Sequence, residues 1–252
     1  MNGDSIPSDN ANPICAIIGA GEGLGKSLAV EFATHGHDIA LVSRSQAGSD
    51  AALSAALEVT PRIDARFFAA DATQPRSVET ALQLVAQNMG EVEVLIYNAR
   101  DSFKGCAPLD LEYEALEQTL RLEVVGALAA AKAVLPGMRR RGHGSLMFSS
   151  ATAAFRGSAI NPAYAIGKFA LRALSQSLSK AYAVDGIHVV HFRIDCDLDV
   201  PIMRQYYQGS DAPDILADPD AIAKSYWAAH QQPPQAWSNE IELRPLTEKW
   251  TY

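Results

Sequence analysis

The sequence predicts an α/β fold, a doubly wound parallel sheet with helices on both faces, in a single domain. The first observation is that short apolar runs alternate with longer segments of helical periodicity. The second is a glycine-rich turn between the first apolar run and a segment with Leu24, Leu28 and Phe32 on one helical face. Successive strand–helix units of this kind give parallel strands joined by right-handed crossovers. Ligands of such sheets bind beyond the carboxyl ends of the strands.

The expected elements follow one another in a regular order. Gly36 stops the first helix, and Pro61 closes the second. The helix over 111–137 is apolar on more than one side, which is typical of deep burial or of a subunit interface, and Pro136 with the basic run behind it ends that helix. We expect strands over 14–18, 37–44, 65–70, 92–97, 145–148, 187–192 and 240–244, and helices over 24–35, 51–59, 75–89, 111–137, 164–184 and from 218 onward.

Length and composition limit the class of protein. The chain of 252 residues carries a formal net charge of −8, which disfavours a nucleic-acid partner because phosphate binding needs a basic surface. No apolar run reaches membrane-spanning length, and residues 1–12 lack the features of a signal peptide. We therefore expect a disordered tail over 1–12, one domain over 13–252, no membrane contact and a cytoplasmic location. The three cysteines show no metal-ligand spacing, so no metal site is expected.

The glycine-rich turn indicates a dinucleotide site. Gly19, Gly23 and Gly25 allow a sharp turn and a close approach of the backbone to a pyrophosphate, which would rest on the free N–H groups of the helix that follows. Glu22 and Leu24 lie between these glycines and belong to the same candidate site. The alternative is an ordinary glycine-rich turn between a strand and a helix.

The end of the second strand bears on the choice of cofactor. In a dinucleotide fold this position lies beside the adenosine ribose, where a carboxylate selects the 2′-hydroxyl and an arginine accommodates a 2′-phosphate. Ser43 and Arg44 stand there without an acidic neighbour, which favours NADP(H) over NAD(H). Glu22 would oppose that preference if it lay near the phosphate. Alternatively, Arg44 is a solvated loop cation.

Tyr164 and Lys168 form a candidate catalytic pair. They are four residues apart on one predicted helix and therefore lie on the same face. A tyrosine hydroxyl is a poor proton donor or acceptor at neutral pH unless a nearby ammonium stabilises its phenolate. Ser149 or Ser150, after the fifth strand, could hold a substrate oxygen beside the tyrosine. An isolated match to this spacing could also be an incidental surface pair.

Taken together, these segments resemble the short-chain dehydrogenase/reductase family from about residue 13 to about residue 198. The glycines fit its cofactor motif, and Tyr164 with Lys168 fits its catalytic pair. The resemblance implies a Rossmann-type fold in which the tyrosine is the general acid/base, the lysine holds the nicotinamide ribose and a serine positions the carbonyl or hydroxyl group. It also implies further cofactor contacts from Asp71, Ala72, Asn98 and Ala99.

Several positions depart from the family pattern. Arg100 replaces the last glycine of Asn-Ala-Gly, and Glu123 replaces an asparagine that organises a water molecule beside the lysine. The family spacing from Tyr164 leads to Ala151 in place of the serine, and Ser150 fits only if the loop holds one extra residue. Ile18, Asp195, Cys196 and Val200 also differ from the expected residues.

Glu123 is the departure with the largest physical consequence. If its carboxylate pairs with Lys168, it offsets the charge that favours the phenolate of Tyr164, and catalysis at neutral pH weakens. If it stays protonated in a dry pocket, it could act as an acid. In a third arrangement the backbone at residue 123 holds the water while the side chain turns away.

We expect an NADP(H)-dependent oxidoreductase that acts on a small carbonyl or secondary alcohol, with Tyr164, Lys168, Ser150 and Glu123 at the catalytic centre. Two alternatives remain: a dinucleotide-binding regulatory protein with little catalysis, and a dehydratase or isomerase that uses Glu123. Residues 201–230 are expected to include a substrate lid, to which Met203, Tyr206 and Tyr207 are suited; alternatively, most of these side chains pack in a helix. The apolar helices over 112–137 and 162–184 are expected to form a homodimer or homotetramer, as the resemblance implies.

Overall fold

The computed structural model describes residues 12–100, 105–207 and 216–247. Its centre is a seven-stranded parallel sheet in the order β3-β2-β1-β4-β5-β6-β7. The expected doubly wound α/β fold is therefore confirmed. The strands are β1 (Ile14–Ile18), β2 (Asp38–Ser43), β3 (Ala65–Ala69), β4 (Val92–Tyr97), β5 (Gly144–Ala151), β6 (Ile187–Ile194) and β7 (Glu240–Leu243).

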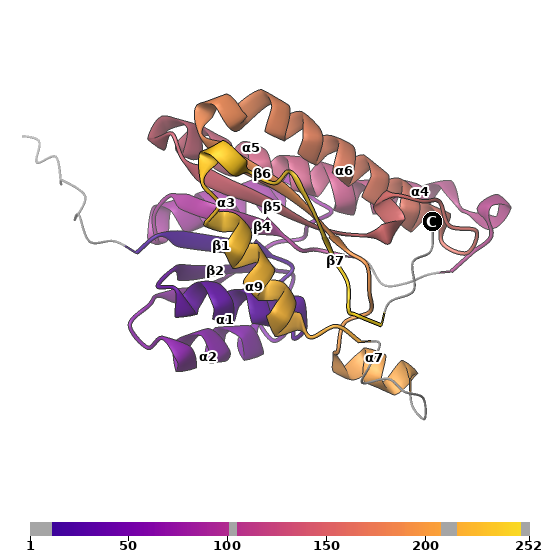
Figure 1. The fold of residues 1–252 in the computed structure, drawn as a ribbon, viewed down its shortest axis with the longest axis horizontal. Coiled ribbons are helices and arrows are strands. Elements are labelled where there is room, and N and C mark those ends of the chain that lie inside the picture. Colours follow the sequence, from indigo (N-terminus) through magenta and orange to yellow (C-terminus); the bar gives the residue numbers. More distant parts are fainter. Residues whose placement is uncertain (1–11, 101–104, 208–215, 248–252) are drawn as a thin grey trace, which may run out of the picture.

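Helices cover both faces of this sheet (Figure 1). One apolar core joins the sheet to α1, α2 and α9, and a second core joins its other face to α3, α5 and α6. Strands β2 and β3 follow β1 on one side of it, and β4 to β7 follow on the other side. The direction in which strands are added therefore reverses between β1 and β4, and the switch point of the sheet lies at the ends of these two strands. The helices are α1 (Leu24–Thr34), α2 (Asp50–Val59), α3 (Pro75–Asn88), α4 (Tyr113–Leu120), α5 (Gly126–Arg141), α6 (Pro162–Tyr182), α7 (Pro201–Tyr206) and α9 (Pro219–His230).

The long helix predicted over 111–137 differs in two ways. A π-helical turn, Arg121–Val125, separates α4 from α5. The helix also continues through Pro136 to Arg141, so the expected end at Gly137 was wrong. Buried Val134, Leu135 and Met138 hold the last turns against the core, and Gly142, with a φ of 74°, supplies the left-handed residue that ends the helix.

Two strands are longer than predicted. β5 extends through Ala151 and β6 through Ile194, because the two strands remain paired in parallel register up to these residues. Ser149 and Ser150 therefore lie within β5, where successive side chains point to opposite faces of the sheet.

Two predicted segments lie largely outside the described residues. Of the tail over 1–12, the structure describes Asn12, and of the lid over 201–230 it does not describe 208–215. On either side of that gap, α7 begins at Pro201 and the Asp218 side chain caps α9 by accepting the N–H of Asp220. Within the described ranges, none of the helices has the length and apolar character needed to cross a bilayer.

Candidate active site

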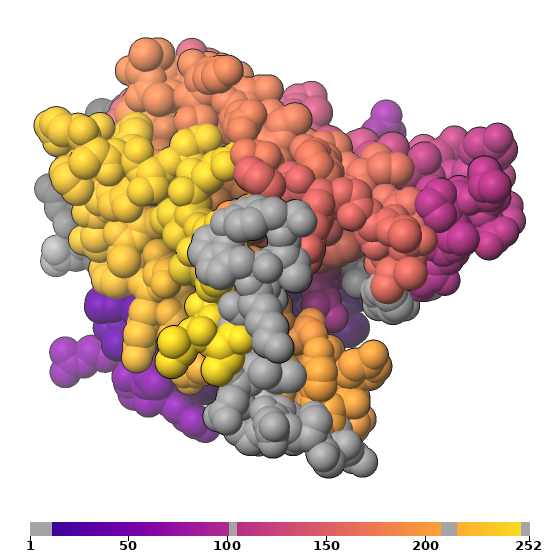
Figure 2. All heavy atoms as spheres, turned by 45° about the vertical axis from the view of Figure 1, so that its right-hand side comes forward, coloured from indigo at the N-terminus to yellow at the C-terminus, as the bar shows by residue number. Residues whose placement is uncertain are grey.

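A cavity of about 790 Å³ lies at the carboxyl ends of the central strands. In Figure 2 the surface is hollowed between α7, in orange, and the pink to red segments above it. All predicted site residues except Glu123 line this cavity: Gly19, Glu22, Gly23, Leu24, Gly25, Ser43, Arg44, Asp71, Ala72, Asn98, Ala99, Ser150, Tyr164 and Lys168. Residues far apart in the sequence are thus brought to one place.

The glycine loop packs too closely for side chains. Gly19 has a φ of +89°, and a Cβ on it would lie 2.6 Å from the backbone nitrogen of Ala99. A Cβ on Gly25 would lie 2.7 Å from Cα of Ala20. Helix α1 begins after Gly23 with no side chain capping its first turn. The N–H of Lys26 donates to the carbonyl oxygens of Gly21 and Gly23, and the first N–H groups of the helix, before Lys26, are the ones available to an anionic ligand.

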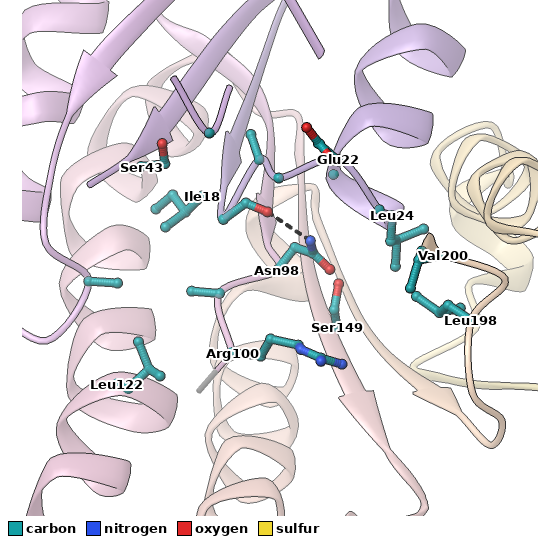
Figure 3. A pocket seen from close by; sticks show the side chains of 18 of the residues that line it. Ile18, Glu22, Leu24, Ser43, Asn98, Arg100, Leu122, Ser149, Leu198 and Val200 are labelled. Atoms are coloured by element: carbon teal, nitrogen blue, oxygen red, sulfur yellow. Dashed lines mark hydrogen bonds between the residues drawn. The ribbon is translucent and has the colours of Figure 1, made fainter. Parts of the chain in front are cut away.

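Asn98 is hydrogen-bonded to the same loop (Figure 3). Its side-chain amide donates a hydrogen bond of 2.9 Å to the carbonyl oxygen of Gly19, and its backbone N–H donates one of 2.8 Å to Ile18. These bonds join the end of β4 to the end of β1. Asn98 therefore fixes the shape of the glycine loop from the neighbouring strand.

The segment after β3 is held by local bonds and by a close helix contact. One carboxylate oxygen of Asp71 accepts hydrogen bonds from the backbone N–H and the hydroxyl of Thr73, at 2.9 and 2.8 Å. A Cβ on Gly126 would overlap the carbonyl oxygen of Ala72. Glycine at the start of α5 thus lets this helix approach the cavity wall.

The side chains of Ser43 and Arg44 differ in whether they already have polar partners. The Ser43 hydroxyl donates to the carbonyl oxygen of Ser45 at 3.0 Å and lies 2.8 Å from the Ser49 hydroxyl. Arg44 is exposed and makes no ion pair with any residue that the structure describes. Its guanidinium is available to an anionic group, while the Ser43 hydroxyl shapes the loop. Glu22 lines the same cavity.

Glu123 forms a buried ion pair with Lys168, so the first of the three arrangements considered for it is the one in the structure. Its Oε2 lies 2.8 Å from Nζ of Lys168, and the two side chains are 1% and 3% exposed. The other carboxylate oxygen, Oε1, is buried without a hydrogen-bond partner among the described residues. Glu123 lies behind Lys168 and does not line the cavity.

The packing of two helices makes this pair possible. A Cβ on Gly167 would lie 2.9 Å from a methyl carbon of Thr119 and 3.0 Å from Cγ of Glu123. The glycine therefore lets α6 approach the π-helical turn that carries Glu123. The Tyr97 hydroxyl donates a hydrogen bond to the carbonyl oxygen of Leu122 within that turn. π-Helical turns often occur at functional sites.

The surroundings of Lys168 favour its charged form. Burial lowers the pKa of the ammonium, but the charges of Glu123 and Tyr164 and the hydrogen bond to Glu123 together outweigh that effect, so the net pKa is raised. Nζ also donates a hydrogen bond of 3.2 Å to the carbonyl oxygen of Ser149 and lies 5.5 Å from the ring centre of Tyr164. Lys168 is thus a charged group held in place beside the tyrosine.

The two candidate serines have different environments. The Ser149 hydroxyl lies 2.8 Å from the hydroxyl of Tyr226 on α9, on the face of the sheet opposite to α6. Ser150 points to the other face, and its buried hydroxyl has no hydrogen-bond partner among the described residues. Ser150 is therefore the serine whose hydroxyl is uncommitted. Ala151, at the family spacing, also lines the cavity.

Sequence reasoning missed part of the cavity wall. Gln118 and Leu122 reach it from α4 and the π-helical turn, and Ile194 and Leu198 belong to its far side, which continues through Val200 into residues 201–205 of the expected lid. A Cβ on Gly23 would meet a Val200 methyl carbon at 3.1 Å, so this far side touches the glycine loop. The Arg100 side chain extends from the end of β4 past Asn98 and Ser149 (Figure 3). The available sequence signal for Ile194 was its apolar side chain, two residues beyond the predicted end of the strand at residue 192.

Comparisons with known proteins identify relatives along most of the chain. An uncharacterized oxidoreductase of Staphylococcus saprophyticus is 25% identical over 239 residues, covering 92% of this chain and 97% of the relative. 2-(S)-Hydroxypropyl-CoM dehydrogenase 3 of Xanthobacter autotrophicus is 28% identical over 178 residues, covering 71% of this chain and 69% of the relative.

Among solved structures, L-sorbose reductase from Gluconobacter frateurii, in complex with NADPH and L-sorbose, shares the fold. Its TM-score is 0.84 at 20% identity, with 94% of this chain and 97% of that chain covered. The sequence profile of the short chain dehydrogenase family matches residues 13–194. The chain therefore belongs to the short chain dehydrogenase family.

Proposed function

We propose that this protein is an NADP(H)-dependent oxidoreductase that interconverts a small carbonyl compound and a secondary alcohol. The observation that carries the proposal is that Tyr164 and Lys168 line the same cavity as the glycine loop and Arg44. The cavity is of the size that binds small molecules and cofactors in other proteins.

The residues present fit a dinucleotide. The glycine loop offers backbone space that a Cβ at Gly19 or Gly25 would fill, and the uncapped first turn of α1 offers N–H groups to a pyrophosphate. Arg44 supports the preference for NADP(H), because its exposed guanidinium can bind a 2′-phosphate through two hydrogen bonds. When bound, the nicotinamide supplies or accepts the hydride.

The chain's own residues would handle the proton and the substrate oxygen. The Tyr164 hydroxyl donates a proton to the carbonyl oxygen during reduction and accepts one from the alcohol during oxidation. The Lys168 ammonium stabilises the negative charge that develops on the tyrosine oxygen. Ser150, whose hydroxyl has no described partner, is the candidate donor of a hydrogen bond to the substrate oxygen.

One observation favours a second candidate function, a dinucleotide-binding protein with weak catalysis. The Glu123 carboxylate offsets the charge of Lys168 at 2.8 Å and so reduces the positive potential at Tyr164. By contrast, a dehydratase or isomerase with Glu123 as the acid gains no support, because Glu123 lies behind Lys168 and away from the cavity.

Two measurements separate these functions. Thermal-shift titrations with NADPH, NADP⁺, NADH and NAD⁺ test cofactor binding, and a panel of carbonyl and alcohol substrates then tests turnover. We expect stabilisation by NADPH and NADP⁺, and turnover that Tyr164→Phe abolishes with little change in cofactor affinity. Stabilisation without turnover on any substrate would favour the binding protein. Turnover retained in the variant would remove Tyr164 from the mechanism.

We also infer a homo-oligomer in the cytoplasm. Apolar side chains are exposed on the helices expected to form the interface, namely Val125, Leu128, Ile166 and Phe169. A second copy of the chain would cover them. Light scattering coupled to gel filtration should give a mass of two or four chains, and a monomer would refute the inference.

A further inference from the structure

A group of histidine and carboxylate side chains lies at the amino-terminal edge of the sheet, opposite to the cavity. His37 immediately precedes β2, Glu93 is the second residue of β4, and His230 is the last residue of α9. Since β1 separates β2 from β4, the group spans the starts of three neighbouring strands (Figure 1). We propose that His37, Glu93 and His230 bind a divalent transition-metal ion, with Zn²⁺ as the ion that their ligand types fit best.

The three side chains already converge. Each offers one ligand atom, and these atoms all lie within 4.8 Å of one another. Nε2 of His230 is 3.7 Å from a carboxylate oxygen of Glu93. Ligands of a tetrahedral zinc ion are about 3.3 Å apart, as bonds of about 2.0–2.1 Å require. Small changes of side-chain torsion would therefore close the site.

His37 is the residue that ordinary packing does not explain. It is 2% exposed, and neither of its ring nitrogens has a hydrogen-bond partner among the described residues. Its ring packs edge-on against Phe32, Trp227 and His230, with centroids 5.3 to 5.6 Å apart. A buried imidazole without a partner loses hydrogen bonds that water would give it. A metal ion would satisfy one of the two nitrogens.

The ligand types also suit the ion. Imidazole nitrogens and a carboxylate oxygen are groups that Zn²⁺ accepts in proteins, and neutral imidazole and ionised carboxylate are their metal-binding forms.

A second residue orients one ligand. The hydroxyl of Ser145, at the start of β5, lies 2.9 Å from Nδ1 of His230. This contact leaves Nε2 directed at Glu93. Metal-binding histidines commonly form such a hydrogen bond through the ring nitrogen that does not bind the metal. The Glu93 side chain is 26% exposed, which provides a path for the ion. Two imidazoles, one carboxylate and a water molecule form a familiar zinc coordination set.

A bound ion would join α9 to the sheet. α9 packs along α1 and also carries Tyr226, which contacts Ser149 near the cavity. The ion would therefore stabilise the helix that follows residues 201–217 without touching the cavity itself. The expected effect of the ion is on the stability of the fold, and its test does not depend on the proposed oxidoreductase activity.

Calorimetric titration of the chelator-treated full chain with Zn²⁺ tests the proposal. We expect one ion per chain and a higher melting temperature. Co²⁺ at the same site should give the intense visible absorption of a tetrahedral centre. Glu93→Gln keeps the size of a partly exposed side chain and should weaken binding by at least about 100-fold, while Ser145→Ala should weaken it by about 10- to 100-fold.

The matched control is His35→Gln. His35 lies two residues from His37, but it pairs with Glu31 at 3.2 Å and its side chain is 37% exposed. This variant should bind Zn²⁺ as the native chain does, whereas His37→Asn should not bind it. Loss of binding in His35→Gln alone, more than one weak site per chain, or unchanged binding in Glu93→Gln would each overturn the proposal. Those results would indicate an adventitious surface ion only.

Discussion

Nζ of Lys168 lies 2.8 Å from a carboxylate oxygen of Glu123, with both side chains almost completely buried. The Lys168 ammonium, which lies beside Tyr164, thus forms its ion pair with Glu123 on the side away from the cavity. Within a low-dielectric site, such a partner fixes the position of the ammonium and also reduces its effect on neighbouring groups. Glu123 is a positioning residue whose contribution to catalysis and to stability should have opposite signs.

Glu123→Gln should therefore destabilise the protein and make it a better catalyst of alcohol oxidation at low pH. Removing one partner of a buried pair costs about 3–5 kcal/mol of unfolding free energy, measurable by urea denaturation. Without the carboxylate, the Lys168 charge acts more strongly on Tyr164, so the pH of half-maximal kcat/KM should move to lower values. A shift toward higher pH would contradict the assigned role.

The double variant Glu123→Gln/Lys168→Met provides the control for stability. It removes both charges, so it should lose less unfolding free energy than the sum of the two single variants. Additive losses would mean that the two side chains do not interact energetically, despite their distance in the structure.

Arg44→Ala should change the choice of cofactor. If the guanidinium holds a 2′-phosphate, its removal costs about 1.5–3 kcal/mol, which raises the Kd for NADPH by about 10- to 100-fold and leaves the Kd for NADH nearly unchanged. Fluorescence titration measures both constants. Arg62→Ala, which removes an exposed arginine outside the cavity wall, is the matched control. Equal losses for both cofactors would refute the phosphate contact.

Gly126→Ala should destabilise the wall of the cavity. The new Cβ would overlap the backbone carbonyl oxygen of Ala72, which cannot move as a flexible side chain can. Overpacking of this kind costs about 1–3 kcal/mol or more, and thermal unfolding would detect it. Gly157→Ala is the control, because a Cβ there has no neighbour within 4 Å. Similar melting temperatures for the two variants would contradict the close approach of α5.

His191 should make the protein less stable on acidification. Burial is the main reason that its pKa falls from 6.5 to about 4 in the folded state, and nearby Glu240 only partly opposes the change. Between these values the unfolded chain binds a proton that the native chain does not, so stability falls as the pH falls from about 6.5 to about 4.

The full effect for His191 is about 3 kcal/mol. Other buried histidines add to the total slope, so the comparison that isolates His191 is with His191→Leu. Denaturant titrations of the two proteins at a series of pH values should show a smaller loss of stability in the variant. Parallel curves would mean that His191 keeps an ordinary pKa when folded.

The sequence by itself determined the fold and most of the cavity. Apolar strand runs and helical periodicities are local patterns, and the glycine loop is compact in sequence, so both could be recognised without knowledge of distant contacts. The carboxyl ends of parallel strands lie at one edge of the sheet, so the sequence alone predicted that Arg44, Asp71 and Asn98 lie at the same edge.

Only the tertiary structure decided which side chains meet across the fold. The pairing of Glu123 with Lys168 depends on how closely α6 approaches the π-helical turn at Gly167, and that turn left no signal in the helical periodicity. The binding of Ser149 to Tyr226 and the group of His37, Glu93 and His230 join residues far apart in the chain. Such contacts depend on the packing of whole elements, which local sequence patterns do not specify.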